Sequence, residues 1–347
     1  MFVTDPTVSV VMPVFNSEDT IVRAVMSVLA QTAPDFELIV VDDASTDASS
    51  ARLDRINDER IWYVRLPENR GACAARNVGL EMARGTWVAF MDADDCLDPR
   101  RLEVLCARAE QLKADIIADN IFLVHAFSYT PSRRGVVETK DGRTLHPSTL
   151  HAADMQDTLP RPIDAAEFVL GNLAGPNSLR LGLLKPMFRR SFLLDRGLRW
   201  DEQVQYGQDF VFFTHCLAAG SPLWMLSESY YYYTANPNGI TKTAPMEASS
   251  RHRLNVNERL ARQYRSRRHL RRALQVRRRH LLDELERARF RTTEATHGLA
   301  AATVRYPRQA GHLLRMYAAR RASNMVQRMR EHGVRATLNH VRRRIYQ

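Results

Sequence analysis

Two aspartates, one residue apart, follow an apolar run in the first third of the chain. Asp92 and Asp94 come directly after Trp87-Val88-Ala89-Phe90-Met91, a run that predicts a buried strand. Hard cations such as Mg²⁺ and Mn²⁺ prefer carboxylate oxygens and keep water and substrate phosphates as their other ligands. The pair therefore predicts a divalent-cation site. The alternative is that Asp98, just before Pro99, caps a following helix and the other carboxylates only surround its N-terminus.

Polar residues also follow three other predicted strands. The strands are β-branched runs at residues 8–12, 37–41 and 61–64, and helices are expected between them at about 19–31 and 72–84. This alternation is typical of a mostly parallel sheet flanked by helices, in which ligands bind beyond the carboxyl ends of the strands. The polar residues at these ends are Asn16, Asp42-Asp43 and Asn69-Arg70-Gly71. The four strand ends together predict one binding crevice.

The signals change along the rest of the chain. A helix from Pro99 and a strand over 115–124 are expected, and 129–160 is a long polar excursion. A short helix is expected to start at Asp164. Beyond Pro245 the sequence is helical and rich in arginine. We therefore predict two domains, a catalytic domain at 1–245 and an Arg-rich, all-helical C-terminal region at 246–347.

Charge is distributed unevenly over the 347 residues, which carry a formal net charge of +11. Residues 251–347 contain 26 Arg and 6 Asp or Glu, a net charge of +20, which leaves −9 for residues 1–250. Arginine favours bidentate contacts with phosphate. Nucleic acid, anionic lipid and polyprenyl phosphate are all compatible with such a tail.

The four cysteines lack the C-x-x-C spacing of a zinc or redox site. The chain opens without a secretory signal pattern, and no run reaches the roughly 18 apolar residues of a membrane-spanning helix. We therefore expect a cytoplasmic protein with reduced thiols.

The front of the chain resembles the GT-A-fold glycosyltransferases of family 2, which are inverting enzymes that use nucleotide-diphospho sugars. Six ordered motifs carry the resemblance over about ninety residues, and it extends more loosely to about residue 240. Within the family the chain is most similar to bacterial exopolysaccharide enzymes of the succinoglycan type. The motifs are residues 8–16, 27–32, 41–47, 69–71, 75–79 and 92–95.

The resemblance implies a nucleotide-sugar site. Pro13, Val14 and Phe15 would hold the base and ribose, with Phe15 stacking on the base unless it belongs to the core. Asp43 matches the carboxylate that reads uracil, although its neighbour Asp42 is barely distinguishable from it. Arg76 is expected to reach the diphosphate, or else to form a salt bridge with Asp92 or Asp94.

The resemblance also implies the metal ligands and the base. Asp94 would bind Mg²⁺ or Mn²⁺, and Asp92 would hold the ribose and share the cation. Asp209 would deprotonate the acceptor hydroxyl, unless it only caps the helix that follows. Gln208 stands where the family usually has Glu, which removes a charge beside the base.

Two later segments are expected to serve other partners. Tyr230 to Tyr233 and Gly239 to Thr241 resemble the part that lines the acceptor side in the family. A long basic helix over 251–289 and a second basic pattern over 313–329 fit an anionic membrane surface, or simply a solvated face. Sparse aromatic residues there disfavour nucleic acid.

The expected function is transfer of a hexose, glucose from UDP-glucose, to a polyprenyl-diphosphate-linked oligosaccharide on the inner face of the cytoplasmic membrane. Another cell-surface glycan such as lipopolysaccharide is the alternative product. An inactive relative serving as a scaffold, or a basic nucleic-acid-binding protein, is the rival from a different class. The presence of Asp92, Asp94 and Asp209 disfavours the inactive relative.

Overall fold

The computed structural model divides the chain into two compact units. The first comprises residues 1–244 and 252–280, and the second comprises 245–251 and 281–347. The domain boundary at residue 245 stays a prediction. The described residues are 5–33, 35–125, 129–133, 135–139, 144–145, 148–149, 160–173, 178–235 and 245–311.

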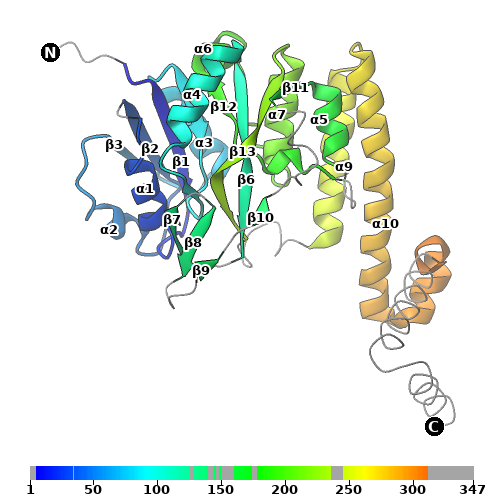
Figure 1. The fold of residues 1–347 in the computed structure, drawn as a ribbon. Coiled ribbons are helices and arrows are strands. Elements are labelled where there is room, and N and C mark those ends of the chain that lie inside the picture. The colour runs from blue at the N-terminus through cyan, green and yellow to red at the C-terminus, as the bar shows by residue number, and fades with distance from the viewer. Residues whose placement is uncertain are drawn as a thin grey trace, which may run out of the picture. The chain divides into compact units, whose positions relative to one another are not determined.

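The first unit is built on a sheet in which ten strands are described. The order across it is β11-β13-β6-β12-β4-β1-β2-β3, with β10 paired to β6 and β5 paired to β13. In Figure 1 strands β1 to β3 lie at the left, and β6 and β13 run side by side at the centre. The strands are β1 (Val8–Val14), β2 (Phe36–Asp42), β3 (Ile61–Arg65), β4 (Trp87–Phe90), β5 (Cys96–Leu97), β6 (Ile116–Val124), β10 (Ser148–Thr149), β11 (Arg161–Ile163), β12 (Met187–Arg189) and β13 (Leu223–Thr234).

Helices cover this sheet, and each of the last two helices has residues in both units. The helices are α1 (Ile21–Leu29), α2 (Ser49–Leu53), α3 (Ala72–Met82), α4 (Arg101–Leu112), α5 (Ala165–Gly171), the short 3₁₀ helix η2 (Leu181–Leu183), α6 (Arg190–Asp195), α7 (Gln208–Ala218), α9 (Met246–Gln263) and α10 (Arg268–Arg305). Within the described residues, no helix is long and apolar enough to cross a membrane.

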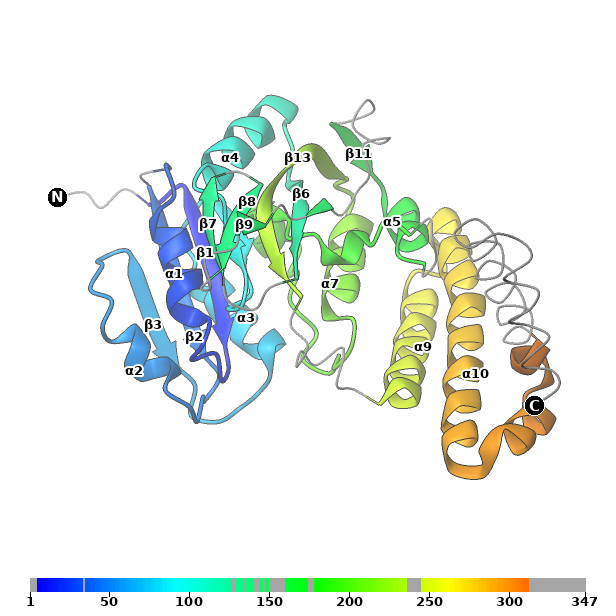
Figure 2. The same cartoon turned by 60° about the horizontal axis from the view of Figure 1, so that its bottom comes forward.

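The front half of the sheet is parallel, as the alternating pattern predicted. β1 pairs in parallel with β2 and with β4, and β2 pairs in parallel with β3. Because parallel crossovers are right-handed, α1 and α2 lie on one face and α3 on the other (Figure 2). Gly79 allows α3 to approach β1 closely, since a Cβ there would lie 2.3 Å from Cγ1 of Val11. These crossovers bring the carboxyl ends of β1, β2 and β4 to one edge.

One strand runs against its neighbours in the middle of the sheet. β12 is antiparallel both to β4 and to β6, whereas β6 and β13 are parallel to each other. This arrangement places Lys185, two residues before β12, beside the end of β4. β12 therefore joins the parallel front of the sheet to its second half at the crevice.

The expected polar excursion at 129–160 contains more regular structure than the sequence predicted. Three short strands, β7 (Tyr129–Arg133), β8 (Val136–Thr139) and β9 (Thr144–Leu145), form a second antiparallel sheet. Tyr129 and Val137 are buried with Phe122 and Tyr232 of the main sheet. This apolar contact explains why the small sheet folds where polar residues alone suggested a loop.

The long helix expected over 251–289 is two helices in the structure, and the prediction of one helix was wrong. The chain turns between Gln263, which ends α9, and Arg268, which begins α10. In the first unit, Leu260 and Leu274 on either side of this turn are fully buried. Folding the sequence back on itself buries both leucines, which one straight helix carrying leucines at mixed spacing would not do.

Candidate active site

The carboxylate of Asp92 lies between two cationic side chains at the end of β4. Arg76 donates from Nη2 to Oδ1 over 2.8 Å, and Lys185 donates from Nζ to Oδ2 over 2.7 Å. The backbone N–H of Asp92 donates to the hydroxyl of Tyr231 on β13 over 3.3 Å. Both carboxylate oxygens of Asp92 are therefore engaged by charged donors.

Lys185 extends this contact to Asp209. Its ammonium group also donates to Oδ2 of Asp209 over 3.3 Å, and its side chain is only 6% exposed. Asp209 lies in the first turn of α7, whose N-cap is Gly207 at a φ of +79° that glycine tolerates. Asp209 is therefore not the N-cap residue, and no side-chain hydrogen bond caps the start of this helix. A small cavity at this point is lined by Arg76, Phe90, Asp92, Lys185, Pro186, Phe188, Trp200, Asp209 and Phe213.

Electrostatics favour the charged forms of Asp92 and Lys185. Burial alone would raise the pKa of Asp92, but Lys185 and Arg76 outweigh burial and hold that pKa well below its usual value. Burial alone would lower the pKa of Lys185, but Asp209 and Asp92 outweigh it and raise that pKa. The site therefore carries a carboxylate and an ammonium at neutral pH, in contact.

Arg76 forms a salt bridge with Asp92, which was the alternative to a contact with the diphosphate. Besides its ion pair with Asp92, it donates to Oε1 of Gln208 over 3.1 Å, and its guanidinium lies 4.5 Å from the ring centre of Trp200. Trp200 is buried and stacks on Phe212. A contact between Arg76 and a diphosphate stays a prediction.

The remaining carboxylates of the run have different surroundings. Asp95 is buried and accepts hydrogen bonds from the Tyr231 hydroxyl over 2.6 Å and from the Thr234 N–H over 2.7 Å. Burial, with Asp94 and Asp92 nearby, raises the pKa of Asp95 well above its usual value. The backbone carbonyl of Asp94 accepts from Arg23 over 2.6 Å. The loop is thus tied to β13 and to α1.

A divalent cation at Asp94 stays a prediction. Among the described side chains, no group of three or more His, Cys, Asp or Glu residues is placed to hold a metal ion. A cation bound with a diphosphate needs few protein ligands, because phosphate oxygens and water complete its coordination. Asp92 would have to release Lys185 or Arg76 to share the cation, and its role as a ligand stays a prediction.

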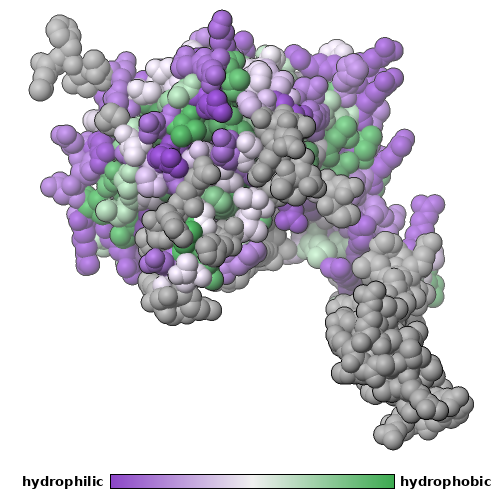
Figure 3. Space-filling view, in the orientation of Figure 1, coloured by the Kyte–Doolittle hydropathy of each residue, from purple (hydrophilic) through white to green (hydrophobic). Residues whose placement is uncertain are grey.

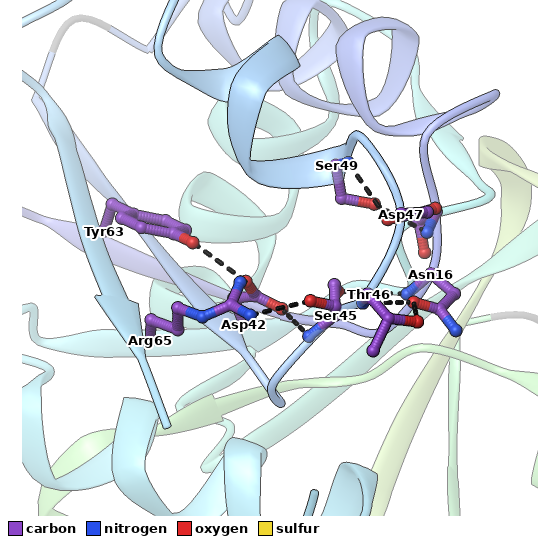
Figure 4. Close-up of polar contacts among 9 residues, drawn as sticks. Asn16, Asp42, Ser45, Thr46, Asp47, Ser49, Tyr63 and Arg65 are labelled. Atoms are coloured by element: carbon purple, nitrogen blue, oxygen red, sulfur yellow. Dashed lines mark hydrogen bonds and ion pairs between the residues drawn. The ribbon is translucent and has the colours of Figure 1, made fainter. Parts of the chain in front are cut away.

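The aspartates after β2 point into different networks. Asp42 accepts from the Tyr63 hydroxyl over 2.8 Å, from Arg65 over 2.6 Å and from the Ser45 N–H over 2.9 Å (Figure 4). Asp43 accepts from the backbone N–H groups of Arg70 and Gly71 over 2.7 and 2.8 Å. Asp42 therefore holds its own strand end, whereas Asp43, directly after β2, joins that end to the segment that leads into α3.

A ring of short polar contacts fixes the turn that follows. Asn16, at the end of β1, accepts at Oδ1 from the N–H of Thr46, and Ser45 accepts at Oγ from the N–H of Asn16 (Figure 4). Asp47 accepts from the N–H of Ser49 at the start of α2 over 3.0 Å. Ser45 and Asp47 thus organise this turn, and the contacts of Asn16 with Ser45 and Thr46 join the ends of β1 and β2.

Residues 13–15 lie at the end of β1. Pro13 and Val14 are buried within the strand, and the side chain of Phe15 is 47% exposed. Its exposure rules out the core position that was the alternative for Phe15. A role in holding the base stays a prediction for all three residues.

The acceptor-side prediction is covered only in part. Tyr230 to Tyr233 lie on β13 as expected, with the first three buried. Gly239 to Thr241 and the basic pattern at 313–329 lie outside the described residues.

Lys185 is the site residue that the sequence analysis missed. It stands alone before a three-residue strand, so no motif pointed to it. Composition held a signal, because the chain has 46 arginines but only four lysines. Composition therefore sets the four lysines apart from the arginines, but it does not distinguish Lys185 from the other three.

The chain is similar to proteins of a known family in sequence and to solved structures in fold. Residues 9–153 match the family model described as glycosyl transferase family 2. The succinoglycan biosynthesis protein ExoO of Rhizobium meliloti (strain 1021) is 34% identical over 244 residues, which are 70% of this chain and 64% of ExoO. The chain thus spans less than two thirds of that relative.

Two solved structures are similar in fold. Mannosyltransferase PcManGT from Pyrobaculum calidifontis, in complex with GDP-Man and Mn²⁺, has a TM-score of 0.55 and 18% identity over 92% of this chain and 83% of that one. S. aureus TarS 1–349 in complex with UDP-GlcNAc has a TM-score of 0.54 and 22% identity over 72% of this chain and 65% of that one. At such identities the likeness shows the fold alone, and the predicted GT-A fold is confirmed.

Proposed function

Because the chain belongs, through residues 9–153, to glycosyl transferase family 2, we propose that it is an inverting hexosyltransferase of bacterial exopolysaccharide biosynthesis. The observation that carries the proposal is the meeting of Asp92 and Asp209 around one ammonium group, although 117 positions separate them in the sequence. A carboxylate at a donor-binding strand end and a second one across the crevice are what a single displacement needs.

In the proposed reaction Asp209 is the general base. Its carboxylate accepts the proton of the acceptor hydroxyl while that oxygen forms a bond to the anomeric carbon of the sugar. The bond from this carbon to the β-phosphate oxygen breaks at the same time, and the nucleoside diphosphate leaves with the electron pair. Attack from the face opposite the leaving group inverts the anomeric configuration.

Asp94 is the residue that we expect to hold Mg²⁺ or Mn²⁺, with Asp92 on the ribose side. A bound cation would neutralise the charge that develops on the leaving diphosphate. PcManGT, whose structure contains Mn²⁺, supports a divalent cation in this fold. Arg76 keeps Asp92 in place through their ion pair, whether or not it also reaches the diphosphate.

We propose UDP-glucose as the donor. The exposed ring of Phe15 and the carboxylate of Asp43 lie at neighbouring strand ends, where a base would stack on the ring and donate from its imide N–H to the carboxylate. TarS binds UDP-GlcNAc, which supports a uridine nucleotide, whereas PcManGT binds GDP-Man. A test of the donor must therefore include both UDP-sugars and a GDP-sugar.

We propose a polyprenyl-diphosphate-linked oligosaccharide as the acceptor, because the relative ExoO belongs to succinoglycan biosynthesis and the C-terminal region is basic. Assembly of another cell-surface glycan is the second candidate. The basic region supports either acceptor equally, since both carry phosphate.

The test is release of nucleoside diphosphate from UDP-glucose, UDP-galactose, UDP-GlcNAc and GDP-mannose, with membranes that carry lipid-linked intermediates. We expect release from UDP-glucose with Mg²⁺ or Mn²⁺, loss of release in EDTA, and a fall in rate of about 10² or more in Asp209→Asn. Absence of binding and release with every donor, together with no effect of Asp209→Asn, would contradict the proposed function.

A further inference from the structure

The position of Lys185 is fixed from the interior of the protein. Its backbone carbonyl accepts a hydrogen bond from the guanidinium of Arg101, which pairs with Asp119 over 2.9 Å. The side chains of Arg101 and Asp119 are fully buried. Two residues further along, β12 pairs with β4 and β6. The main chain of Lys185 is therefore held between two strands and a buried ion pair.

From this anchor the side chain of Lys185 reaches two carboxylates of the crevice. Its three ammonium donors suit two acceptors that lie in different directions, at 2.7 Å from Asp92 and 3.3 Å from Asp209. A planar guanidinium is larger and prefers to place two parallel bonds on one carboxylate. Arg76 already binds the other oxygen of Asp92. The geometry explains why a lysine stands here in a chain with 46 arginines.

We propose that Lys185 is a positioning residue that couples the candidate base Asp209 to the donor-binding end of β4. The inference rests on the proposed function and adds a residue to it. Asp92 has a second cation in Arg76, whereas Asp209 reaches β4 through Lys185. Loss of the ammonium therefore frees the carboxylate of Asp209 more than that of Asp92.

Lys185 acts through Asp209 in this proposal and has no direct part in donor binding. Its side chain is 6% exposed, and its ammonium group pairs with two carboxylates of the protein. Removing it should slow the chemical step, because a base displaced by about 1 Å can cost about 100-fold in rate. The affinity for the nucleotide sugar should change little.

The first experiment compares Lys185→Met with the unmodified protein. We expect kcat to fall at least about tenfold, with the KM for the UDP-sugar within about threefold. Lys113→Met is the matched control, because Lys113 is exposed at the end of α4, and it should leave both constants unchanged. If Lys185→Met does not fold, Lys185→Gln keeps hydrogen-bond donors without the charge and serves in its place.

A double-mutant cycle separates positioning from a structural role. In the Asp209→Asn background, Lys185→Met should change the residual rate by less than about twofold, since the group through which it acts is gone. An equal loss of rate in both backgrounds, or an unchanged kcat in Lys185→Met alone, overturns the inference. Sugar transfer by the unmodified protein distinguishes this failure from a failure of the proposed function, in which no donor is used.

Discussion

Four charged side chains from distant parts of the chain balance one another at the candidate site. Arg76 and Lys185 supply two positive charges, and Asp92 and Asp209 supply two negative ones. Gln208 accepts from Arg76 as a neutral partner. A glutamate at this place would add a third carboxylate to the same cations. Because the amide of Gln208 is neutral, Arg76 remains paired with Asp92, and Lys185 is shared between Asp92 and Asp209.

At the residue scale, the first prediction concerns Asp94. We expect Asp94→Ala to reduce metal-dependent release of UDP by about 10² or more, because the variant lacks the carboxylate that would hold the cation. Release of UDP from UDP-glucose, titrated with Mn²⁺, is the measurement.

The control for this prediction is Asp54→Ala, which removes an exposed carboxylate at the end of α2. It should leave both the rate and the Mn²⁺ titration unchanged. An unaltered Mn²⁺ titration in Asp94→Ala would mean that the cation, if one is used, is held elsewhere.

The sequence named Arg76, Asp92 and Asp209, which meet at the candidate site, but it did not show how the residues of the site pair. Asp42 and Asp43 are adjacent, so their side chains leave a strand end in opposite directions, and only the fold shows which meets Arg65 and which meets Arg70. The pairing of Lys185 with Asp92 joins positions 93 residues apart. Such a contact depends on strand order, which the sequence pattern does not contain.

At the element scale, long and periodic segments were predicted well. Strands β1, β2 and β4 are buried runs, and the intervening helices follow the pattern of a parallel sheet. β12 has only three residues and runs antiparallel to both neighbours, so neither its length nor its direction was detectable. The residue that it positions, Lys185, was missed for the same reason.

The turn between α9 and α10 has a physical cause that the charge pattern concealed. Asn257 on α9 is fully buried and donates from Nδ2 to the carbonyl of Leu274 on α10 over 3.0 Å, and Arg277 donates to its Oδ1 over 3.2 Å. The guanidinium of Arg277 also lies 3.7 Å from the ring centre of Phe210 on α7. An arginine-rich sequence suggests solvated helices, yet these side chains fasten residues 252–280 within the first unit.

We predict that Asn257→Ala destabilises the protein by about 1–3 kcal/mol. The substitution leaves the carbonyl of Leu274 and one N–H group of Arg277 without this partner in a buried place. Urea denaturation followed by circular dichroism measures the change. Asn255→Ala, two positions away and exposed on the same helix, should shift the free energy of unfolding by less than about 0.5 kcal/mol. Equal midpoints for both variants would contradict the role of Asn257.

At the scale of the whole molecule, the basic C-terminal region is not one uniform surface. In the first unit Arg259 pairs with Asp201 and Arg278 pairs with Glu258, so part of the positive charge is used in folding. On the face seen in Figure 3, hydrophobic side chains of the described residues form small, separate patches. On this face, attraction to an anionic surface would rest on charge more than on apolar insertion, and would weaken with salt.

Residues 312–347 are the part whose removal tests that attraction most cleanly. They carry nine Arg and one Glu, a net charge of +8, whereas a cut at residue 245 would also remove Leu260 and Leu274 from the core of the first unit. We expect a chain ending at Gly311 to bind vesicles containing anionic lipid at least about tenfold more weakly at 0.1 M salt, because each Lys or Arg near such a surface contributes about 1 kcal/mol. Release of UDP from UDP-glucose in solution should be unchanged.

Vesicle co-sedimentation over a range of salt concentrations, with neutral-lipid vesicles as the control, is the measurement. Equal binding of both chains to anionic vesicles, with salt-dependent retention on RNA by the full chain alone, would favour nucleic acid as the partner of this segment.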